Sequence, residues 1–290
     1  MTGSSSTGPS FSARARAWVE LLHPLPVLFV MSAAILFALL ATGGRPNPLR
    51  LALLLGALFG GQAAIGALNE YHDRVLDARV KPEKPIPSGR VSPRFALTYA
   101  GVGLLVLAIT GALLGLVPLF VAAAGTGAGV AYDYWFKETA LSWVPYLFAL
   151  PLLPIWVWLC LSTFDPKLFV LYPIGAPVVI AVHLAQSLPD AVRDRAEGVR
   201  GLAALLGPER AFWAICLATT MAAVEVAIIG MVFDKRPGAA LLAAFVCIVA
   251  VAFAIVARRR DAEVVERRLF PLIAGGTIVL GFGLVVAIAA

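Results

Sequence analysis

Acidic side chains at two places in the chain have the spacing of metal ligands. Asn69, Asp73 and Asp77 follow one another at intervals of four residues, and Asp190 and Asp194 repeat that interval. On a helix, residues four apart lie on one face, about 6 Å apart along the axis. Carboxylates stacked in this way repel one another unless a positive charge lies between them. The spacing therefore predicts a first ladder (Asn69, Asp73, Asp77) and a second ladder (Asp190, Asp194), each beside a cation.

The donor atoms indicate which cation this is. The ladder side chains offer only oxygen, which suits a hard cation. Mg²⁺ is typically held by one or two carboxylates together with the phosphate oxygens of a substrate. Two ladders that face each other would hold a magnesium-bridged diphosphate. The alternative is that the acids are solvated charges at the membrane surface, paired with Arg74, Arg79, Arg193 and Arg195.

Basic residues stand near the first ladder and again in the middle of the chain. Lys81, Lys84 and Arg90 lie in a Pro-rich turn directly after the first ladder, and Lys137 follows Tyr132 at the end of an apolar run. A departing diphosphate needs its developing charge neutralised, and Lys and Arg side chains do this in phosphoryl chemistry. For each cation the alternative is an ordinary positive charge at the cytoplasmic face of a membrane.

The composition places these groups in a lipid bilayer. Hydrophobic residues make up 60% of the chain and charged residues 14%, with a mean hydropathy of +0.89. Soluble domains carry roughly 25% charged residues, and a membrane-spanning helix needs about 20 apolar residues. We therefore expect an all-α, polytopic membrane protein with about nine transmembrane helices. The expected spans are residues 18–40, 49–71, 95–114, 118–136, 142–161, 168–188, 209–231, 238–257 and 269–289.

The distribution of basic residues predicts an orientation. With the N-terminus inside, 18 of the 23 Lys and Arg residues fall in inner loops, and the outer loops hold five: Arg45, Arg50, Lys167, Lys235 and Arg236. Basic residues favour the cytoplasmic side. We expect a multi-pass protein of a prokaryotic-type cytoplasmic membrane with its active site at the cytoplasmic face. The net charge of +6 reflects this topology, and we predict no nucleic-acid partner.

The sequence predicts one structured domain. Residues 1–12 are small and polar, so we expect a disordered tail over 1–17 and a single transmembrane domain over 18–290. The three cysteines lie inside apolar runs without partners, which is typical of small core residues. They are Cys160, Cys216 and Cys247.

The acidic motifs resemble those of the UbiA superfamily of intramembrane prenyltransferases. The family pattern N-D-x-x-D-x-x-x-D corresponds to the segment from Asn69 to Asp77, with Glu70 where Asp is commoner. The pattern D-x-x-x-D followed by glycine corresponds to the segment from Asp190 to Gly198, where Arg193 replaces a frequent third acid.

Two further motifs and their order support the resemblance. The segment K-P-E-K-P-I-P-S-G-R, Lys81 to Arg90, looks like the family's basic continuation of the first motif. Tyr132 and Lys137 are similar to the Tyr/Lys element that follows the fourth helix. The resemblance covers roughly residues 18–290.

The resemblance implies a function and a set of site residues. Members bind an allylic prenyl diphosphate through Mg²⁺, with the prenyl tail in a central cavity that opens to the bilayer. The diphosphate ionises, and a small, often aromatic acceptor attacks the allylic cation. The implied metal ligands are Asn69, Asp73, Asp77, Asp190 and Asp194. The implied catalytic residues are these four aspartates with Tyr132 and Lys137, and the implied or candidate substrate contacts are Asn69, Arg74, Lys84, Arg90, Lys137 and His183.

Aromatic side chains could shelter the cation. Candidates are Trp135, Tyr146, Phe148, Trp156 and Trp158, of which most are expected to be packing or interface residues.

Two other functions remain open at this point. A UbiA-type terpene cyclase would use the same acids to ionise a prenyl diphosphate without an external acceptor. An ion-coupled transporter would place its acids near the bilayer midplane, whereas these acids lie at one face, which is less favourable to that reading.

Overall fold

The computed structural model describes residues 11–233 and 237–289, and the regular elements in these two ranges are all helical. The bounds are α1 Phe11–Glu20, α2 Pro24–Ala41, α3 Pro48–Val80, α4 Pro93–Leu114, α5 Leu116–Ala131, η1 Tyr132–Phe136, α6 Val144–Leu161, η2 Pro166–Val170, α7 Leu171–Ser187, η3 Leu188–Asp190, α8 Ala191–Ala196, α9 Leu202–Phe233, α10 Gly238–Arg258 and α11 Ala262–Ala289.

The described ranges contain nine helical segments that are long and apolar enough to cross a membrane. This confirms the predicted all-α class and the predicted number of spans. The second predicted span, residues 49–71, continues as α3 through Val80, so one helix carries the whole first ladder. Lys235 and Arg236, predicted in an outer loop, and residues 1–10 lie outside the described residues.

The start of the bundle differs from the prediction. We expected a disordered tail over 1–17 and a first helix over 18–40, but residues 11–20 form α1, and α2 begins at Pro24. His23 between them has φ 49°, a left-handed conformation that breaks the helix. The break agrees with the sequence, because proline is favoured in the first turn of a helix.

Helix α1 is held in place by apolar contacts that the tail prediction overlooked. Ala17 and Leu21 are fully buried, and they pack with Ile86 and Val91 of the loop after α3 and with Ala96 of α4.

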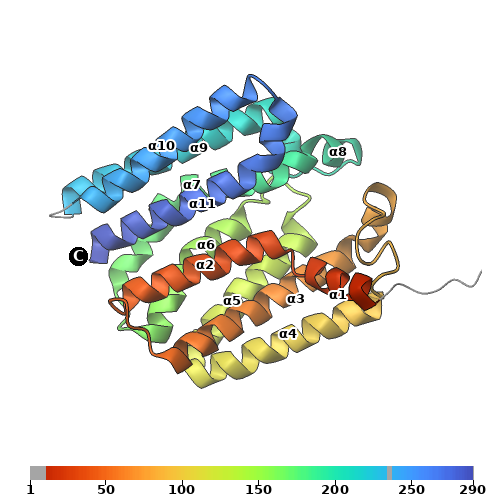
Figure 1. The fold of residues 1–290 in the computed structure, drawn as a ribbon, viewed down its shortest axis with the longest axis horizontal. Helices are drawn as coiled ribbons and strands as arrows, with labels where there is room; N and C mark the ends of the chain where they lie inside the picture. The colour runs from red at the N-terminus through yellow and green to blue at the C-terminus, as the bar shows by residue number, and fades with distance from the viewer. Residues whose placement is uncertain (1–10, 234–236, 290) are drawn as a thin grey trace, which may run out of the picture.

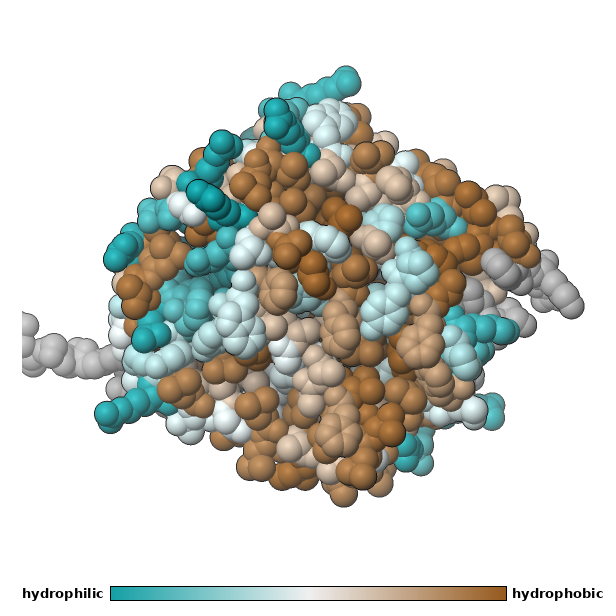
Figure 2. All heavy atoms as spheres, turned by 180° about the vertical axis from the view of Figure 1, so that it is seen from behind, coloured by the Kyte–Doolittle hydropathy of each residue, from teal (hydrophilic) through white to brown (hydrophobic). Residues whose placement is uncertain are grey.

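The helices run roughly side by side, and the polar elements gather at one end of the bundle. Figure 1 shows α1, α8 and the loop after α3 at the same end, opposite the C-terminus. Figure 2 shows apolar side chains over much of one face, with the largest hydrophilic area toward the end that carries α1. Large apolar residues face outward along the spans, among them Leu105 and Ile109 of α4 and Phe253 of α10. Such a surface matches hydrocarbon.

Close packing of α3 on α4 depends on two glycines. A Cβ added at Gly103 would lie 2.6 Å from the backbone oxygen of Gly60 and 3.1 Å from the backbone nitrogen of Ala64. The two backbones therefore touch without side chains between them, as is common between membrane helices. This contact fixes the helix that carries the first ladder.

We expect Gly103→Leu to lower the thermal unfolding midpoint in detergent. The added side chain meets backbone rather than a flexible side chain, and overpacking of this kind costs about 1–3 kcal/mol or more. Gly101→Leu is the matched control on the same helix, because nothing lies within 4 Å of a Cβ there. Equal midpoints for the two variants would contradict the described contact.

Candidate active site

One cavity of about 630 Å³ contains both ladders. Its lining at the polar end of the bundle includes Asn69, Asp73, Asp77, Asp190 and Asp194. The first three come from α3 and the last two from η3 and α8, which follow α7. Segments that are far apart in the sequence therefore present their acids to a common space.

The first ladder is surrounded by hydrogen-bond donors and cations. Asn69 Nδ2 donates to Asp133 Oδ1 at 2.8 Å, and Asp73 forms an ion pair with Lys137. Asp77 Oδ2 lies 2.7 Å from Lys84 Nζ. Each carboxylate of this ladder has a lysine as its immediate partner.

The second ladder is joined to the loop after α3. Asp190 Oδ2 lies 2.8 Å from Lys81 Nζ, and its other oxygen pairs with Arg193. Asp194 lines the cavity one helical turn further on. Lys81 belongs to the segment that directly follows the first ladder, so this ion pair connects the two ladders across the mouth of the cavity.

Glu70 does not line the cavity, although it occupies a position of the acidic motif. Its side chain is 1% exposed and lies 2.8 Å from Lys84 Nζ and 3.3 Å from His23 Nε2. Burial alone would lower the pKa of Lys84, but the carboxylates of Glu70 and Asp77 outweigh it and hold the pKa above its ordinary value. Glu70 thus positions a cation behind the first ladder.

A π-helical turn places the Tyr/Lys element. In η1 the backbone N–H of Lys137 donates to the oxygen of Tyr132 at 2.8 Å, a spacing of five residues. A regular helix would set these residues about 140° apart, whereas here Tyr132, Asp133 and Lys137 all line the cavity. Burial opposes the charge of Lys137, but the Asp73 carboxylate outweighs it and keeps the pKa of Lys137 raised.

Three predicted substrate contacts do not line the cavity. Arg90 turns away to α1, with Nη2 at 2.7 Å from Glu20 Oε2. Arg74 donates to the backbone oxygen of Tyr71 and lies over the Tyr71 ring, because it directly follows Asp73 and so faces a different side of α3.

His183 is the third of these residues. It is 1% exposed and lies behind the cavity wall, where its Nε2 is 2.9 Å from Ser142 Oγ. The His183 ring contacts the rings of Tyr132 and Tyr146, both of which line the cavity, so His183 packs behind the cavity wall.

Of the aromatic candidates, Tyr146 lines the cavity, and its hydroxyl donates to Gln186 Oε1 at 2.9 Å. Trp156 and Trp158 are buried in the apolar core at the far end of the bundle. Trp135 is 70% exposed and Phe148 44% exposed, as expected of residues at the bundle surface.

The sequence prediction missed Asp133. This carboxyl is 4% exposed, lines the cavity and accepts a hydrogen bond from Asn69 of the first ladder. The signal was an acid inside an apolar span, which is a functional candidate by default. Ser142 and Gln186, which also line the cavity, carried no such signal.

The ladders suit a cation that is shared with a substrate. No group of three or more His, Cys, Asp or Glu side chains in the described part of the chain is gathered closely enough to hold a metal ion alone. The donor set is oxygen, and four basic side chains pair with ladder carboxylates: Lys81, Lys84, Lys137 and Arg193. Such a set fits Mg²⁺ when phosphate oxygens complete its coordination.

Comparison with known proteins gives a family and a fold. The model of the UbiA prenyltransferase family matches residues 28–284. The bacteriochlorophyll synthase 33 kDa chain of Cereibacter sphaeroides is 31% identical over 261 residues, which cover 85% of this chain and 84% of that protein. The digeranylgeranylglyceryl phosphate synthase of Natronomonas pharaonis is 31% identical over 203 residues, 69% of this chain and 72% of the relative.

A solved structure shares the fold. The UbiA homologue from Archaeoglobus fulgidus, bound to GPP and Mg²⁺, superposes with a TM-score of 0.71 at 18% identity, over 94% of this chain and all of that chain. Together with the family match over most of the sequence, this shows that the chain is an integral, multi-pass membrane enzyme that belongs to the UbiA prenyltransferase family.

Proposed function

We propose that this prenyltransferase uses an allylic prenyl diphosphate, held by Mg²⁺ between the two ladders, and transfers its prenyl group to a small acceptor. The proposal is based on the distribution of charged and apolar side chains in the cavity. Both ladders and the ammonium groups of Lys81, Lys84 and Lys137 gather at one end, and apolar side chains line most of the remainder. A substrate with a charged head and a hydrocarbon tail matches both parts.

The metal would lie between the ladders. Asn69, Asp73, Asp77, Asp190 and Asp194 are the residues that would hold it, together with diphosphate oxygens. When bound, Mg²⁺ supplies positive charge to the departing diphosphate. The Archaeoglobus homologue with GPP and Mg²⁺ supports this assignment by analogy of fold.

The chain's own cations would bind the head group. Lys84 and Lys137 have raised pKa values, so both are charged at neutral pH. As the allylic C–O bond breaks, its electron pair leaves with the diphosphate, and these ammonium groups neutralise the added charge. The acceptor then forms the new bond to the allylic carbon and loses a proton.

The cavity wall would protect the cation and orient the acceptor. Tyr132 would face the allylic carbon, because aromatic faces stabilise cations and apolar walls exclude water. The polar side chains of Ser142, Tyr146 and Gln186 lie on the same wall and would orient the acceptor. We place this end at the cytoplasmic face, because the inner loops hold the excess of basic residues.

Purified protein with Mg²⁺ and labelled allylic diphosphates tests the proposal. The acceptors supplied are a phenol and the two classes that the relatives' names suggest, a glyceryl phosphate lipid and a tetrapyrrole. We expect diphosphate release and a prenylated product only when a suitable acceptor is present. Hydrocarbon or terpene alcohol formed without an acceptor would indicate the cyclase instead, and no Mg²⁺-dependent binding of any allylic diphosphate would refute the proposal.

We expect Asp73→Asn and Asp190→Asn each to reduce diphosphate release by about 10²–10³-fold, the loss typical when a charge-stabilising group is removed. Each change removes one metal ligand and leaves the packing in place. Asp165→Asn is the matched control, because Asp165 caps η2 outside the cavity and asparagine caps equally well. Wild-type release in either ladder variant would remove the basis of the site assignment.

We expect Lys84→Met to destabilise the protein, because it removes the lysine that pairs with buried Glu70 and leaves only the contact with His23. Loss of one member of a buried pair costs about 3–5 kcal/mol. The double variant Glu70→Gln with Lys84→Met should recover part of this loss. Thermal unfolding in detergent measures both changes, and a double variant no more stable than Lys84→Met would contradict the described pair.

The difference in stability between wild type and the double variant Glu70→Gln with Lys84→Met also has a defined pH dependence. Because the pKa of Lys84 is raised in the fold, its stabilisation is fully present below the unfolded value of about 10.4 and is lost as pH rises through the folded value. The stability difference between wild type and the double variant, in which Gln at position 70 does not titrate, should therefore stay constant from about pH 6 to 9 and shrink only above that range. A difference that already shrinks between these values would contradict the raised pKa.

A further inference from the structure

Asp133 is a buried carboxyl group that the proposed function does not use. It lies in the π-helical turn η1 and is 4% exposed. Its Oδ1 accepts a hydrogen bond from Asn69 Nδ2 at 2.8 Å, whereas its Oδ2 is buried and has no partner among the described residues. Burial of a carboxylate that is only partly hydrogen-bonded is costly, and an acid in a membrane span is a functional candidate. The bond to Asn69 therefore indicates where this side chain acts.

Asp133 itself is poorly placed to bind a metal ion. One of its oxygens is taken by the Asn69 amide, and the other is enclosed by protein. Asn69, by contrast, is half-buried and lines the cavity one helical turn before Asp73. A short-range effect of Asp133 on a bound metal ion therefore has to pass through the Asn69 side chain.

The Asn69 amide has two ends, and only its oxygen can bind Mg²⁺. Its nitrogen lies 2.8 Å from Asp133 Oδ1 and 3.4 Å from Asp73 Oδ2. Ionised carboxylates only accept hydrogen bonds, so a flipped amide would set its oxygen against both carboxylates with no hydrogen between them. The shorter contact, with Asp133, therefore fixes the nitrogen end of the amide and leaves Oδ1 for the metal ion.

The π-helical turn contacts the first ladder at two successive positions. Asp133 accepts a hydrogen bond from Asn69, and Lys137, four residues later, forms an ion pair with Asp73. The acid of the turn thus meets an amide and the base meets a carboxylate, so both contacts are attractive. A carboxylate at position 69 would face Asp133 with no donor between them, which gives a physical reason for an amide at this position.

We infer that Asp133 is a positioning residue, which holds the Asn69 amide so that its oxygen is presented to the metal ion. Groups that hydrogen-bond to a metal ligand from behind commonly set its orientation, and their loss typically costs about 10–100-fold in metal affinity. The inference rests on the proposed function, because it assumes Mg²⁺ at the ladders. It adds a residue that acts on the metal site without binding the metal ion or the substrate.

Metal affinity measured in a double-variant cycle tests the inference. The readout is the Kd of Mg²⁺ for the full-length protein in detergent, in the presence of saturating geranyl thiolodiphosphate, which resists ionisation. We expect Asp133→Asn to raise this Kd by about 10–100-fold, because an amide at position 133 can donate as well as accept and no longer fixes Asn69. Asn69→Ala should raise the Kd as well, because it removes the ligand itself.

The decisive comparison is the effect of Asp133→Asn in the Asn69→Ala background. Without an amide to orient, only the lost charge of Asp133 can still weaken the binding of Mg²⁺. The factor by which Asp133→Asn raises the Kd should therefore be at least about fivefold larger in wild type than in Asn69→Ala. A smaller ratio would show that Asp133 acts through its charge alone, which overturns the inference.

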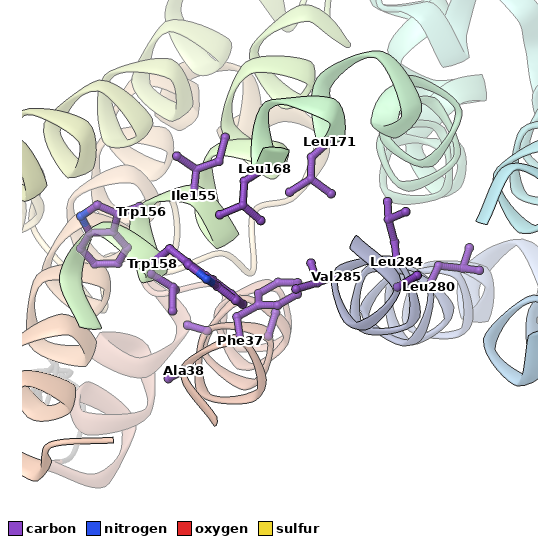
Figure 3. Close-up of a cluster of buried hydrophobic side chains, with 14 of the residues drawn as sticks. Phe37, Ala38, Ile155, Trp156, Trp158, Leu168, Leu171, Leu280, Leu284 and Val285 are labelled. Atoms are coloured by element: carbon purple, nitrogen blue, oxygen red, sulfur yellow. The ribbon is translucent and has the colours of Figure 1, made fainter. Parts of the chain in front are cut away.

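Trp156→Phe is the matched control for loss of a buried hydrogen bond. Figure 3 shows Trp156 in the apolar core with Ile155 and Trp158. Its Nε1 donates to the backbone oxygen of Pro118 at 2.8 Å, and Pro118 belongs to α5, the helix that continues into η1. This variant should lower the thermal unfolding midpoint and leave the Kd of Mg²⁺ unchanged. A Kd that rises as much as in Asp133→Asn would show that loosening of the helix is sufficient, and would also overturn the inference.

The outcomes separate the inference from the proposed function. If wild type binds the thiolodiphosphate with a dependence on Mg²⁺ but Asp133→Asn leaves the Kd of Mg²⁺ unchanged, the positioning role alone is wrong. If wild type shows no Mg²⁺-dependent binding, the proposed function fails and this inference fails with it. Should Asp133→Asn not fold, Asp133→Ser takes its place in the cycle, because a hydroxyl likewise donates and accepts.

Discussion

Pairing of carboxylates with lysines at the polar end of the bundle is the constraint on which the rest of the site depends. Two like charges about 4 Å apart repel by about 4 kcal/mol at the effective dielectric near a protein surface. The acids of the two ladders are tolerated together because lysines from two different segments pair with them. Lys137 arrives from η1, and Lys81 and Lys84 arrive from the loop after α3. The electrostatics therefore fix where two separate segments, η1 and the loop after α3, must lie relative to the ladders.

Several local irregularities follow from this constraint. The π-helical turn at η1 brings Lys137 onto the face that carries Tyr132, which a regular helix would not do. Glu70 does not line the cavity; its buried carboxylate contacts Lys84 instead. The left-handed residue His23 lets the chain turn between α1 and α2 while its ring stays beside Glu70. Each departure from regular structure serves the placement of a charge.

The sequence predicted what depends on periodicity and missed what depends on orientation. Apolar runs located the spans, and the four-residue spacing placed the first ladder along one helix, α3, whereas Asp190 ends η3 and Asp194 lies in α8. The spacing could not say that Arg74 faces away from Asp73, that Arg90 pairs with α1, or that His183 stands behind Ser142. Those outcomes depend on which neighbouring side chains each residue contacts in the fold. The π-helical turn could not be predicted either, because it has no characteristic sequence pattern.

The cavity joins a charged end to a hydrocarbon-like interior, and this has a thermodynamic consequence for a ligand that arrives from the bilayer. In water, each buried CH₂ group would gain about 0.8 kcal/mol. A chain already dissolved in lipid gains almost nothing by moving into an apolar pocket, because the two surroundings are equally apolar. The polar end must then provide nearly all of the binding free energy of such a ligand. The apolar walls can discriminate among hydrocarbon chains only by steric exclusion of those that do not fit.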